Sequence, residues 1–260
     1  MPQPQQTILQ TLNQSHSAHK KSFALLIDPD NTTVGELPNL LTLAHGAGVV
    51  ALLVGGSLIV NSNFGSLIAA IRADSHLPII IFPGSNHHID ARADGILLLS
   101  LISGRNPDFL IGQHVIAAPM IKKSGLEVLP TGYILIDGGA PTTVSYISGT
   151  QPIPADKPAI AACTALAGAQ LGLQLIYLDA GSGAAQPITP KLIAAVRREV
   201  DIPLIVGGGI RTAHEATKAW QAGADLIVVG NAIEADTSLI TAIGAAAAQL
   251  NSEPSLQSVL

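Results

Sequence analysis

The sequence predicts an α/β protein, a (β/α)8 TIM barrel built as a single domain over residues 1–260. Three observations support this prediction. Eight short apolar runs recur along the chain, helical patterns separate most of them, and none alternates cleanly between apolar and polar residues. Continuous apolar runs are typical of parallel strands that are buried on both faces. A doubly wound open sheet is the alternative, and the set of eight strands argues against it.

The elements follow one another in a regular order. The predicted strands are residues 23–27, 49–54, 78–82, 95–99, 132–136, 174–178, 203–206 and 225–229. Residues 7–21 predict an initial helix that covers the barrel floor. Thr212 and Glu215 have the spacing of a capping box, and Thr189 followed by Pro190 is typical of a helix start.

Two connections depart from the regular pattern. A covering helix barely fits between residues 82 and 95, because a crossover between parallel strands needs about a dozen residues in total. This side of the wall is therefore expected to be thin or open. Residues 138–162 form a long connection rich in Pro, Gly, Thr and Ser, which favours an active-site lid or an oligomer contact.

Composition excludes several classes of protein. The chain has 48% hydrophobic and 12% charged residues, so a disordered chain is ruled out. A net charge of -5 without a basic run argues against a nucleic-acid partner. One cysteine, Cys163, excludes a disulfide framework. No apolar run reaches the roughly 18 residues of a membrane span, and the start lacks a signal-peptide pattern, so we expect a soluble cytoplasmic protein.

Glycines gather where the predicted strands end. Gly207, Gly208 and Gly209 follow the seventh strand, and Gly230 and Asn231 follow the eighth. Glycine lets backbone amides approach an anion closely, and the loops after strands seven and eight are the usual phosphate site of TIM barrels. The alternative is a pair of tight turns. The pattern indicates a phosphate and does not indicate a reaction.

Carboxylates follow two other strands. Asp28 and Asp30 come after the first strand, and with Ser57 after the second they suit a hard cation such as Mg2+. The alternative for this pair is an Asp-Pro turn with Asp30 as a helix cap. Tyr177 and Asp179 share one face of the sixth strand, where Asp179 could orient a substrate hydroxyl, act as a base, or cap the turn that follows.

Other reactive side chains give weaker patterns. His87 and His88 are expected to be exposed loop residues, and His114 is expected to pack or make a polar contact. Cys163 is expected to be a small buried residue, and Trp220 to pack its helix onto the barrel. No Ser–His–Asp set, Cys–His pair or strand-end lysine supports acyl transfer or aldolase chemistry.

Taken together, the strand ends resemble one family. The segments LIDPDN, LLVGGS, IIIFPGS, SLISGRNPDFLIGQH, TGYILIDGG, IYLDAGSGA, PLIVGGGIR and LIVVGNAIE occur in this order between residues 23 and 234. They resemble the geranylgeranylglyceryl phosphate synthases, a family that includes bacterial heptaprenylglyceryl phosphate synthases. The YLDAGSG and SLISGRNP segments are similar to its group II branch.

The resemblance implies a fold and a reaction. The family fold is a TIM barrel whose third helix is replaced by a non-helical segment. The implied reaction joins a polyprenyl diphosphate, geranylgeranyl here, to the primary hydroxyl of sn-glycerol 1-phosphate with Mg2+. Asp28 and Ser57 would hold the metal, and Asp28 and Asp179 would be catalytic. The implied glycerol 1-phosphate contacts are Tyr177, Leu178, Asp179, Ala180, Gly181, Ser182, Gly183, Gly208, Gly209, Gly230 and Asn231.

Two departures from the family pattern stand out. The family usually has Glu where this chain has Asp179, and it often has Lys where this chain has Asn31. The prenyl tail needs an apolar groove, and the thin wall is its natural exit, with Leu97, Leu99 and Phe109 as lining residues. We also expect a homo-oligomer, dimer or hexamer, and a transient membrane contact. A phosphosugar isomerase or lyase and a silent phosphate-binding barrel are the competing hypotheses.

Overall fold

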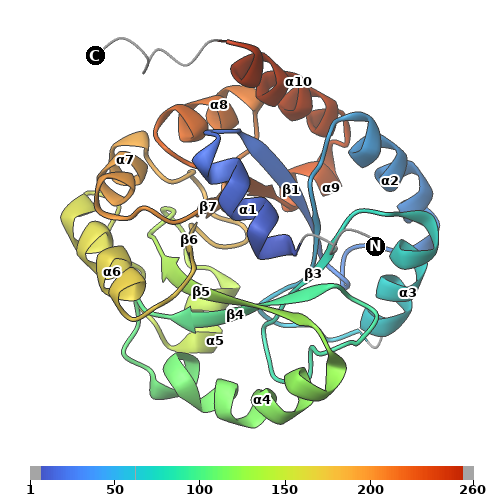
Figure 1. Cartoon of the computed structure of the whole chain (residues 1–260), viewed down its shortest axis with the longest axis horizontal. Helices are drawn as coiled ribbons and strands as arrows, with labels where there is room; N and C mark the ends of the chain where they lie inside the picture. The colour runs from blue at the N-terminus through green and yellow to red at the C-terminus, as the bar shows by residue number, and fades with distance from the viewer. Residues whose placement is uncertain (1–6, 62, 254–260) are drawn as a thin grey trace, which may run out of the picture.

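The strands form a closed parallel barrel. The computed structural model describes residues 7–61 and 63–253, and its strands are hydrogen-bonded in the order β1 to β8, with β8 pairing back onto β1 (Figure 1). The predicted TIM barrel is therefore confirmed. Its strands are β1 (Ser22–Ile27), β2 (Leu52–Gly55), β3 (Ile79–Phe82), β4 (Gly95–Leu101), β5 (Glu127–Leu135), β6 (Leu175–Asp179), β7 (Leu204–Gly207) and β8 (Leu226–Val229).

Helices surround this barrel in chain order. The outer ring contains α2 (Leu37–Gly46), α3 (Phe64–Asp74), α4 (Gln113–Ser124), α6 (Pro158–Gln170), α7 (Pro190–Glu199), α8 (Ala213–Gln221) and α10 (Ser238–Ser252). Shorter helical pieces are η1 (Val34–Glu36), the π-helical turn η2 (Asp108–Gly112), α5 (Thr143–Ser148) and α9 (Asn231–Ala235). Within the described residues, no helix combines the length and the apolar character that crossing a membrane requires.

The first helix covers one end of the barrel, as predicted. In α1 (Ile8–Ser17), Ile8, Leu9 and Leu12 pack against the interior core of the barrel. The Glu127 carboxylate, at the start of β5, accepts hydrogen bonds from the first two amides of the helix. The helix ends before the predicted boundary at residue 21, because His19 adopts a left-handed conformation with a φ of 53°.

The two unusual connections have different outcomes. Residues 83–94, all within the described part of the chain, form turns without a helix between β3 and β4, which confirms the expected replacement of the third helix. The long connection after β5 is more ordered than its composition suggests. It contains α5, and a parallel bridge pairs Ile136 with Ile153 before α6 begins.

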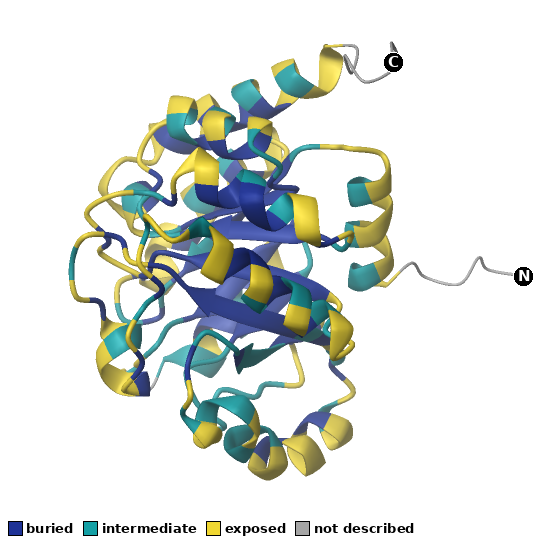
Figure 2. Ribbon diagram, turned by 90° about the vertical axis from the view of Figure 1, so that its left-hand side faces the viewer, coloured by how far each residue is buried: buried dark blue, intermediate teal, exposed yellow. Residues whose placement is uncertain are grey.

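The core has two apolar layers, one inside the barrel and one between the barrel and its helices. Figure 2 shows the buried strands surrounded by helices with exposed outer faces. Alternate residues of a strand enter alternate layers: Tyr177 of β6 faces the interior, and Leu178 faces the helices. Trp220 is 1% exposed and its indole donates to the Ser22 carbonyl at 3.0 Å, so its predicted packing onto the barrel is confirmed.

The predicted helix caps are present, whereas one strand boundary and one burial prediction were wrong. The capping box of Thr212 and Glu215 and the cap at Thr189 are both present. Strand β5 begins at Glu127 rather than at residue 132, because it pairs with β4 along seven residue positions that start at Glu127 opposite Gly95. The expected burial of Cys163 was wrong, since this residue lies on the exposed face of α6.

Candidate active site

A polar cavity opens at the carboxyl ends of the strands. Its volume, open mouth included, is about 950 Å³. It is bounded by the strand-end loops after β1, β2, β6, β7 and β8 and by one residue each from β3 and α5. The lining residues are Leu26, Asp28, Gly55, Gly56, Ser57, Leu58, Phe82, Thr143, Tyr177, Asp179, Gly181, Ser182, Gly183, Ala184, Gly208, Gly209, Ile210, Arg211, Val228, Val229, Gly230, Asn231, Ala232 and Glu234.

This cavity brings most of the predicted site residues together. Asp28 and Ser57 lie on its wall with Asp179 and the glycine loops. Leu178 and Ala180 do not join them. Both are at most 1% exposed, and their side chains pack in the core layer beneath the helices, because they alternate with the inward-facing Tyr177 and Asp179.

The loops after β6, β7 and β8 form a glycine-lined cradle. Gly208 and Gly209 have φ values of 80° and 72°, which L side chains rarely adopt. A Cβ atom on Gly209 would lie 2.5 Å from the Gln186 carbonyl oxygen, so the loops approach each other closely. The Ser182 hydroxyl donates to the Asn231 side chain at 2.9 Å, which joins two of the loops. This geometry suits a compact anion such as phosphate.

Asp179 is held from two sides. The Tyr133 hydroxyl donates to Oδ2 at 2.5 Å, and the Gly181 amide donates to Oδ1 at 2.7 Å. The residue is 8% exposed. Burial raises the pKa of the Asp179 carboxyl above its usual value, and the hydrogen bonds from Tyr133 and Gly181 oppose that shift. A buried carboxylate with a raised pKa is a stronger base than an exposed one and is suited to accept a proton from a substrate hydroxyl.

Asp28 and Asp30 have separate roles in the structure. The Asp28 carboxylate lines the cavity, and burial raises its pKa although the Asp30 amide donates to Oδ1 at 2.9 Å. Asp30 turns toward the loop after β2, where its carboxylate accepts from the amides of Val60 and Asn61 at 2.9 and 2.8 Å. Asp30 therefore fastens two loops together and is neither a helix cap nor a partner of Asp28 in the cavity.

A hard cation would have oxygen donors at this edge. Within the described residues, no group of three or more His, Cys, Asp or Glu side chains is arranged to hold a metal ion. The donor set near Asp28 is instead one carboxylate and the Ser57 hydroxyl. Gly56 lies directly beside this carboxylate, since a Cβ atom there would be in van der Waals contact with Asp28 Oδ2 at 3.6 Å. These oxygen ligands fit Mg2+ with substrate phosphate and water completing its shell.

The sequence patterns did not indicate three side chains at this site, of which Glu234 and Arg211 line the polar cavity and Tyr133 contacts it through Asp179. Tyr133 reaches Asp179 from the neighbouring strand. Glu234 lines the cavity from α9, and burial of its carboxyl together with the charge of Asp28 raises its pKa. Arg211 follows β7, and its guanidinium donates to the carbonyl oxygens of Ala184 and Ala185 at 2.6 and 2.9 Å. The segment PLIVGGGIR ends in Arg211, so the sequence could have indicated this residue as part of the site.

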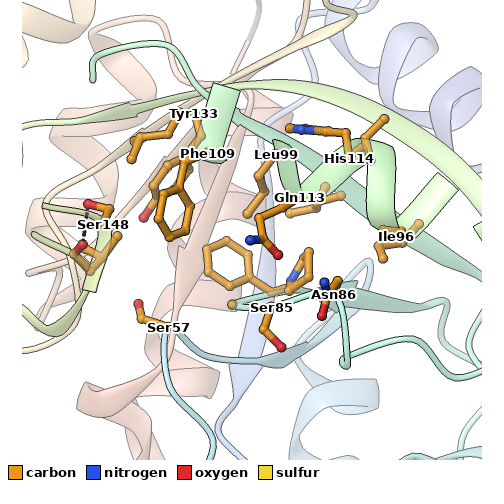
Figure 3. A pocket seen from close by; sticks show the side chains of 18 of the residues that line it. Ser57, Ser85, Asn86, Ile96, Leu99, Phe109, Gln113, His114, Tyr133 and Ser148 are labelled. Carbon is orange, nitrogen blue, oxygen red and sulfur yellow. Dashed lines mark hydrogen bonds between the residues drawn. The ribbon is translucent and has the colours of Figure 1, made fainter. Parts of the chain in front are cut away.

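A second cavity, largely apolar, adjoins the first. Its volume with its open mouth is about 840 Å³, and it lies between β4, η2, α4 and the non-helical segment after β3. Leu97, Leu99 and Phe109 are all on its wall, as predicted for an apolar groove; Figure 3 shows Leu99 and Phe109 beside Tyr133. Ser57 and Phe82 line both cavities, so the apolar groove and the polar cavity adjoin at these two residues.

Of the three histidines considered in the sequence, only His88 departs from its prediction. His87 is exposed, as expected, but His88 is partly buried and its Nδ1 accepts from the Gly84 amide at 3.2 Å. Burial lowers the pKa of His88. His114 makes the expected polar contact, with its Nε2 3.3 Å from the Ser100 hydroxyl, and it lines the apolar groove.

The fold and site define a TIM-barrel protein with an anion-fitting cradle, a buried carboxylate and an adjoining apolar groove. Residues 16–247 match the model of the PcrB family. The chain belongs to this family.

Named relatives extend the comparison. The chain is 56% identical over 232 residues to a geranylgeranylglyceryl phosphate synthase of Spirosoma linguale, covering 89% of this chain and 93% of that protein. It is 53% identical over 220 residues to the synthase of Chitinophaga pinensis, covering 85% and 87%. The chain also superposes with a TM-score of 0.88 on a crystal structure of (S)-3-O-geranylgeranylglyceryl phosphate synthase from Thermoplasma acidophilum in complex with its substrate sn-glycerol-1-phosphate. The two are 33% identical, and the match covers 94% of this chain and 99% of that chain.

Proposed function

We propose that this protein is a Mg2+-dependent prenyltransferase. It joins a polyprenyl diphosphate, geranylgeranyl diphosphate in the first instance, to the primary hydroxyl of sn-glycerol 1-phosphate. The products are a prenylglyceryl phosphate ether and diphosphate. Membership of the PcrB family and the named activity of its relatives support this assignment.

One observation carries the proposal: an anion-fitting polar cavity and an apolar groove meet at Ser57 and Phe82. A reaction between a phosphorylated polyol and a long hydrocarbon diphosphate needs the two environments side by side, so that the reacting atoms can approach to about 3–3.5 Å. A phosphosugar isomerase would need the polar cavity alone. The extended apolar wall, including Leu97, Leu99 and Phe109, would then be without a purpose.

The acceptor fits the glycine cradle. Its phosphate lies against Gly208, Gly209 and Gly230, where backbone amides are accessible, and its glycerol extends toward Asp179. The Asp179 carboxylate accepts a hydrogen bond from the primary hydroxyl and receives its proton as the new bond forms. Ser182 and Asn231, bonded to each other at 2.9 Å, keep the loops of the cradle in register.

The donor places its diphosphate beside Asp28 and its chain in the apolar groove. The carbon–oxygen bond to diphosphate breaks, the acceptor oxygen forms the ether bond to the same carbon, and the diphosphate leaves with the bonding electrons. Asp28 and Ser57 would hold Mg2+, which supplies neutralisation of the charge that develops on the leaving diphosphate. Phe82 lines both the groove and the polar cavity, so its ring would contact the donor close to the reacting carbon.

Product formation tests this assignment. Mass spectrometry of the lipid product should detect the prenylglyceryl phosphate only when donor, acceptor and Mg2+ are all present. Asp28→Asn should lower turnover at least about 100-fold at unchanged melting temperature, since one charged metal ligand is lost. Asp74→Asn, an exposed carboxylate at the end of α3, is the matched control. Full turnover by Asp28→Asn would exclude the metal assignment.

Further properties belong to the same proposal. We expect a cytoplasmic protein that contacts the membrane transiently to collect its donor, and a homo-oligomer, either dimer or hexamer. The outer faces of α4 and α6 support assembly: Val115, Ile116 and Ile160 are at least half exposed, and α6 contains no charged residue. An apolar helix surface of this kind is usually covered. Analytical ultracentrifugation tests it, and a strictly monomeric protein would contradict it.

A further inference from the structure

We propose that Tyr133 is a positioning residue of this site. Its phenol holds the Asp179 carboxylate in the orientation in which that carboxylate receives the proton of the acceptor, and its ring forms part of the donor groove. This inference rests on the proposed function, and it adds a residue to which neither the sequence patterns nor the site predictions assigned a role.

The geometry fixes the carboxylate on both oxygens. Tyr133 lies on β5 opposite Tyr177, and Asp179 lies two residues further along β6. The Tyr133 hydroxyl reaches Oδ2 at 2.5 Å, and the Gly181 amide reaches Oδ1 at 2.7 Å. Gly208 packs behind the same group, since a Cβ atom there would lie 2.6 Å from Oδ1. The plane of the carboxylate is therefore set by its three neighbours.

The ring of Tyr133 is itself immobilised by aromatic contacts. Phe82, Tyr133 and Tyr177 meet edge to face, with ring centroids 5.6 to 6.1 Å apart. Tyr133 is 4% exposed. Its ring shares the wall of the apolar groove with Leu99 and Phe109, as Figure 3 shows, while its hydroxyl is bonded to the carboxylate of the polar cavity. One side chain thus contacts both substrate environments.

The phenol keeps its proton throughout. Burial, together with the charge of Asp179, raises the pKa of Tyr133 well above its usual value. Tyr133 therefore donates a hydrogen bond and does not act as the base. The acceptor's proton moves to Asp179, and the hydrogen bond from Tyr133 stabilises the ionised carboxylate that must be present before transfer.

Few other groups face this carboxylate. On β6, the phenol of Tyr177 lies beside it, and burial also raises the pKa of that phenol. Asp28, Arg211 and Glu234 line the same cavity from the loops after β1 and β7 and from α9. Among the described residues, Tyr133 is the side chain that hydrogen-bonds Asp179, so its removal has a defined effect on the ionised form.

Tyr133→Phe tests the proposal with the ring retained. Loss of a hydrogen bond to a charged group should move the acid limb of the pH profile of kcat/KM upward by about 1 to 2 pH units. The KM for the prenyl diphosphate should change less than about twofold, because the groove wall keeps its shape. Tyr146→Phe, at a tyrosine that is 86% exposed, is the matched control and should leave the limb in place. A lower rate with an unmoved limb would overturn the proposal.

A second variant keeps both the ring and the hydroxyl. Replacement of Tyr133 by 3-fluorotyrosine makes the phenol a stronger donor, so the acid limb should move downward. In an Asp179→Asn background, Tyr133→Phe should have no further effect on turnover, because Tyr133 acts through Asp179. Independent, multiplying losses in the double variant would assign Tyr133 a separate role and contradict the inference.

The titration of Asp179 can be followed without turnover. The carboxyl carbon of Asp179, observed by NMR in the ligand-free protein, should titrate at higher pH in Tyr133→Phe than in the unmodified protein. If no acceptor supports turnover but this shift is found, the proposed function fails and the link between the two residues stands. If turnover is found without the shift, the positioning role is wrong.

Discussion

Gly208 offers a sharp test of how the cradle is built. Its φ is 80°, and a Cβ atom would lie 2.6 Å from Asp179 Oδ1 and 2.7 Å from the Gly181 amide nitrogen. Gly208→Ala therefore imposes a left-handed backbone on alanine, at a cost of about 1–2 kcal/mol. It also pushes apart the 2.7 Å hydrogen bond between Gly181 and Asp179, which is worth about 1.5–3 kcal/mol because the acceptor is charged.

Gly125, which follows α4 and lines neither cavity, provides the matched control for this variant. Its φ is 75°, and a Cβ atom there would have no atom within 4 Å, so Gly125→Ala carries the backbone cost alone. At about 2–4 °C per kcal/mol, the control should lower the melting temperature by about 2–8 °C and Gly208→Ala by about 5–20 °C.

Two assays read out the difference. Thermal unfolding measures the stability loss, and calorimetric titration with sn-glycerol 1-phosphate measures acceptor binding. We expect Gly208→Ala to weaken binding at least about tenfold, or about 1.4 kcal/mol, while Gly125→Ala leaves binding unchanged, because only Gly208→Ala widens the cradle. Equal stability losses and equal affinities in the two variants would refute the close approach of the β6 and β7 loops.

Three more predictions concern the carboxylates and the groove. Asp179 has a raised pKa in the folded state, so its ionisation destabilises the fold. Relative to Asp179→Asn, the unmodified protein should lose stability as the pH rises from about 3.8 through the folded pKa, and the difference should stay level above it. Urea unfolding at a series of pH values measures this difference. Mg2+ should raise the melting temperature of the unmodified protein. The rise should be smaller in Asn31→Lys, because the lysine ammonium group would take the place of the cation beside Asp28. An equal rise in both proteins would exclude a Mg2+ site at Asp28. Phe109→Ala should widen the apolar groove and increase the relative kcat/KM for donors longer than geranylgeranyl diphosphate in a donor series; an unchanged ranking would exclude Phe109 as a limit on chain length.

Much of the barrel could be predicted because its signals are local. Six of the eight predicted strands have a glycine or a carboxylate directly after them, while Pro83 follows the third and Ser100 the fourth. Period-two alternation alone predicts that Tyr177 and Asp179 face the interior of the barrel. Leu178 and Ala180 show that not every residue of a family motif contributes a side chain to the site. The same alternation that brings Asp179 inward sends its two neighbours beneath the helices.

What could not be predicted depends on contacts between distant segments. Tyr133 reaches Asp179 across 46 residues, and no spacing in the sequence marks a bond between neighbouring strands. Asp30 has the sequence position of a metal ligand or a helix cap, yet its partners are the amides of Val60 and Asn61, 30 and 31 residues away. Glu234 enters the cavity from the first turn of α9, a helix too short to be recognised by periodicity.

The choice between two mirror-image acceptors tests the proposed prenyl transfer to sn-glycerol 1-phosphate most directly. Diphosphate release from geranylgeranyl diphosphate with Mg2+ should occur with sn-glycerol 1-phosphate and not with sn-glycerol 3-phosphate. In the proposed binding mode, the glycine cradle takes the phosphate and Asp179 the primary hydroxyl, an arrangement that fits only one enantiomer. Release with the 1-phosphate alone is the predicted result. No release with either acceptor, even with longer donors, would contradict the assignment and leave a phosphate-binding barrel with another activity.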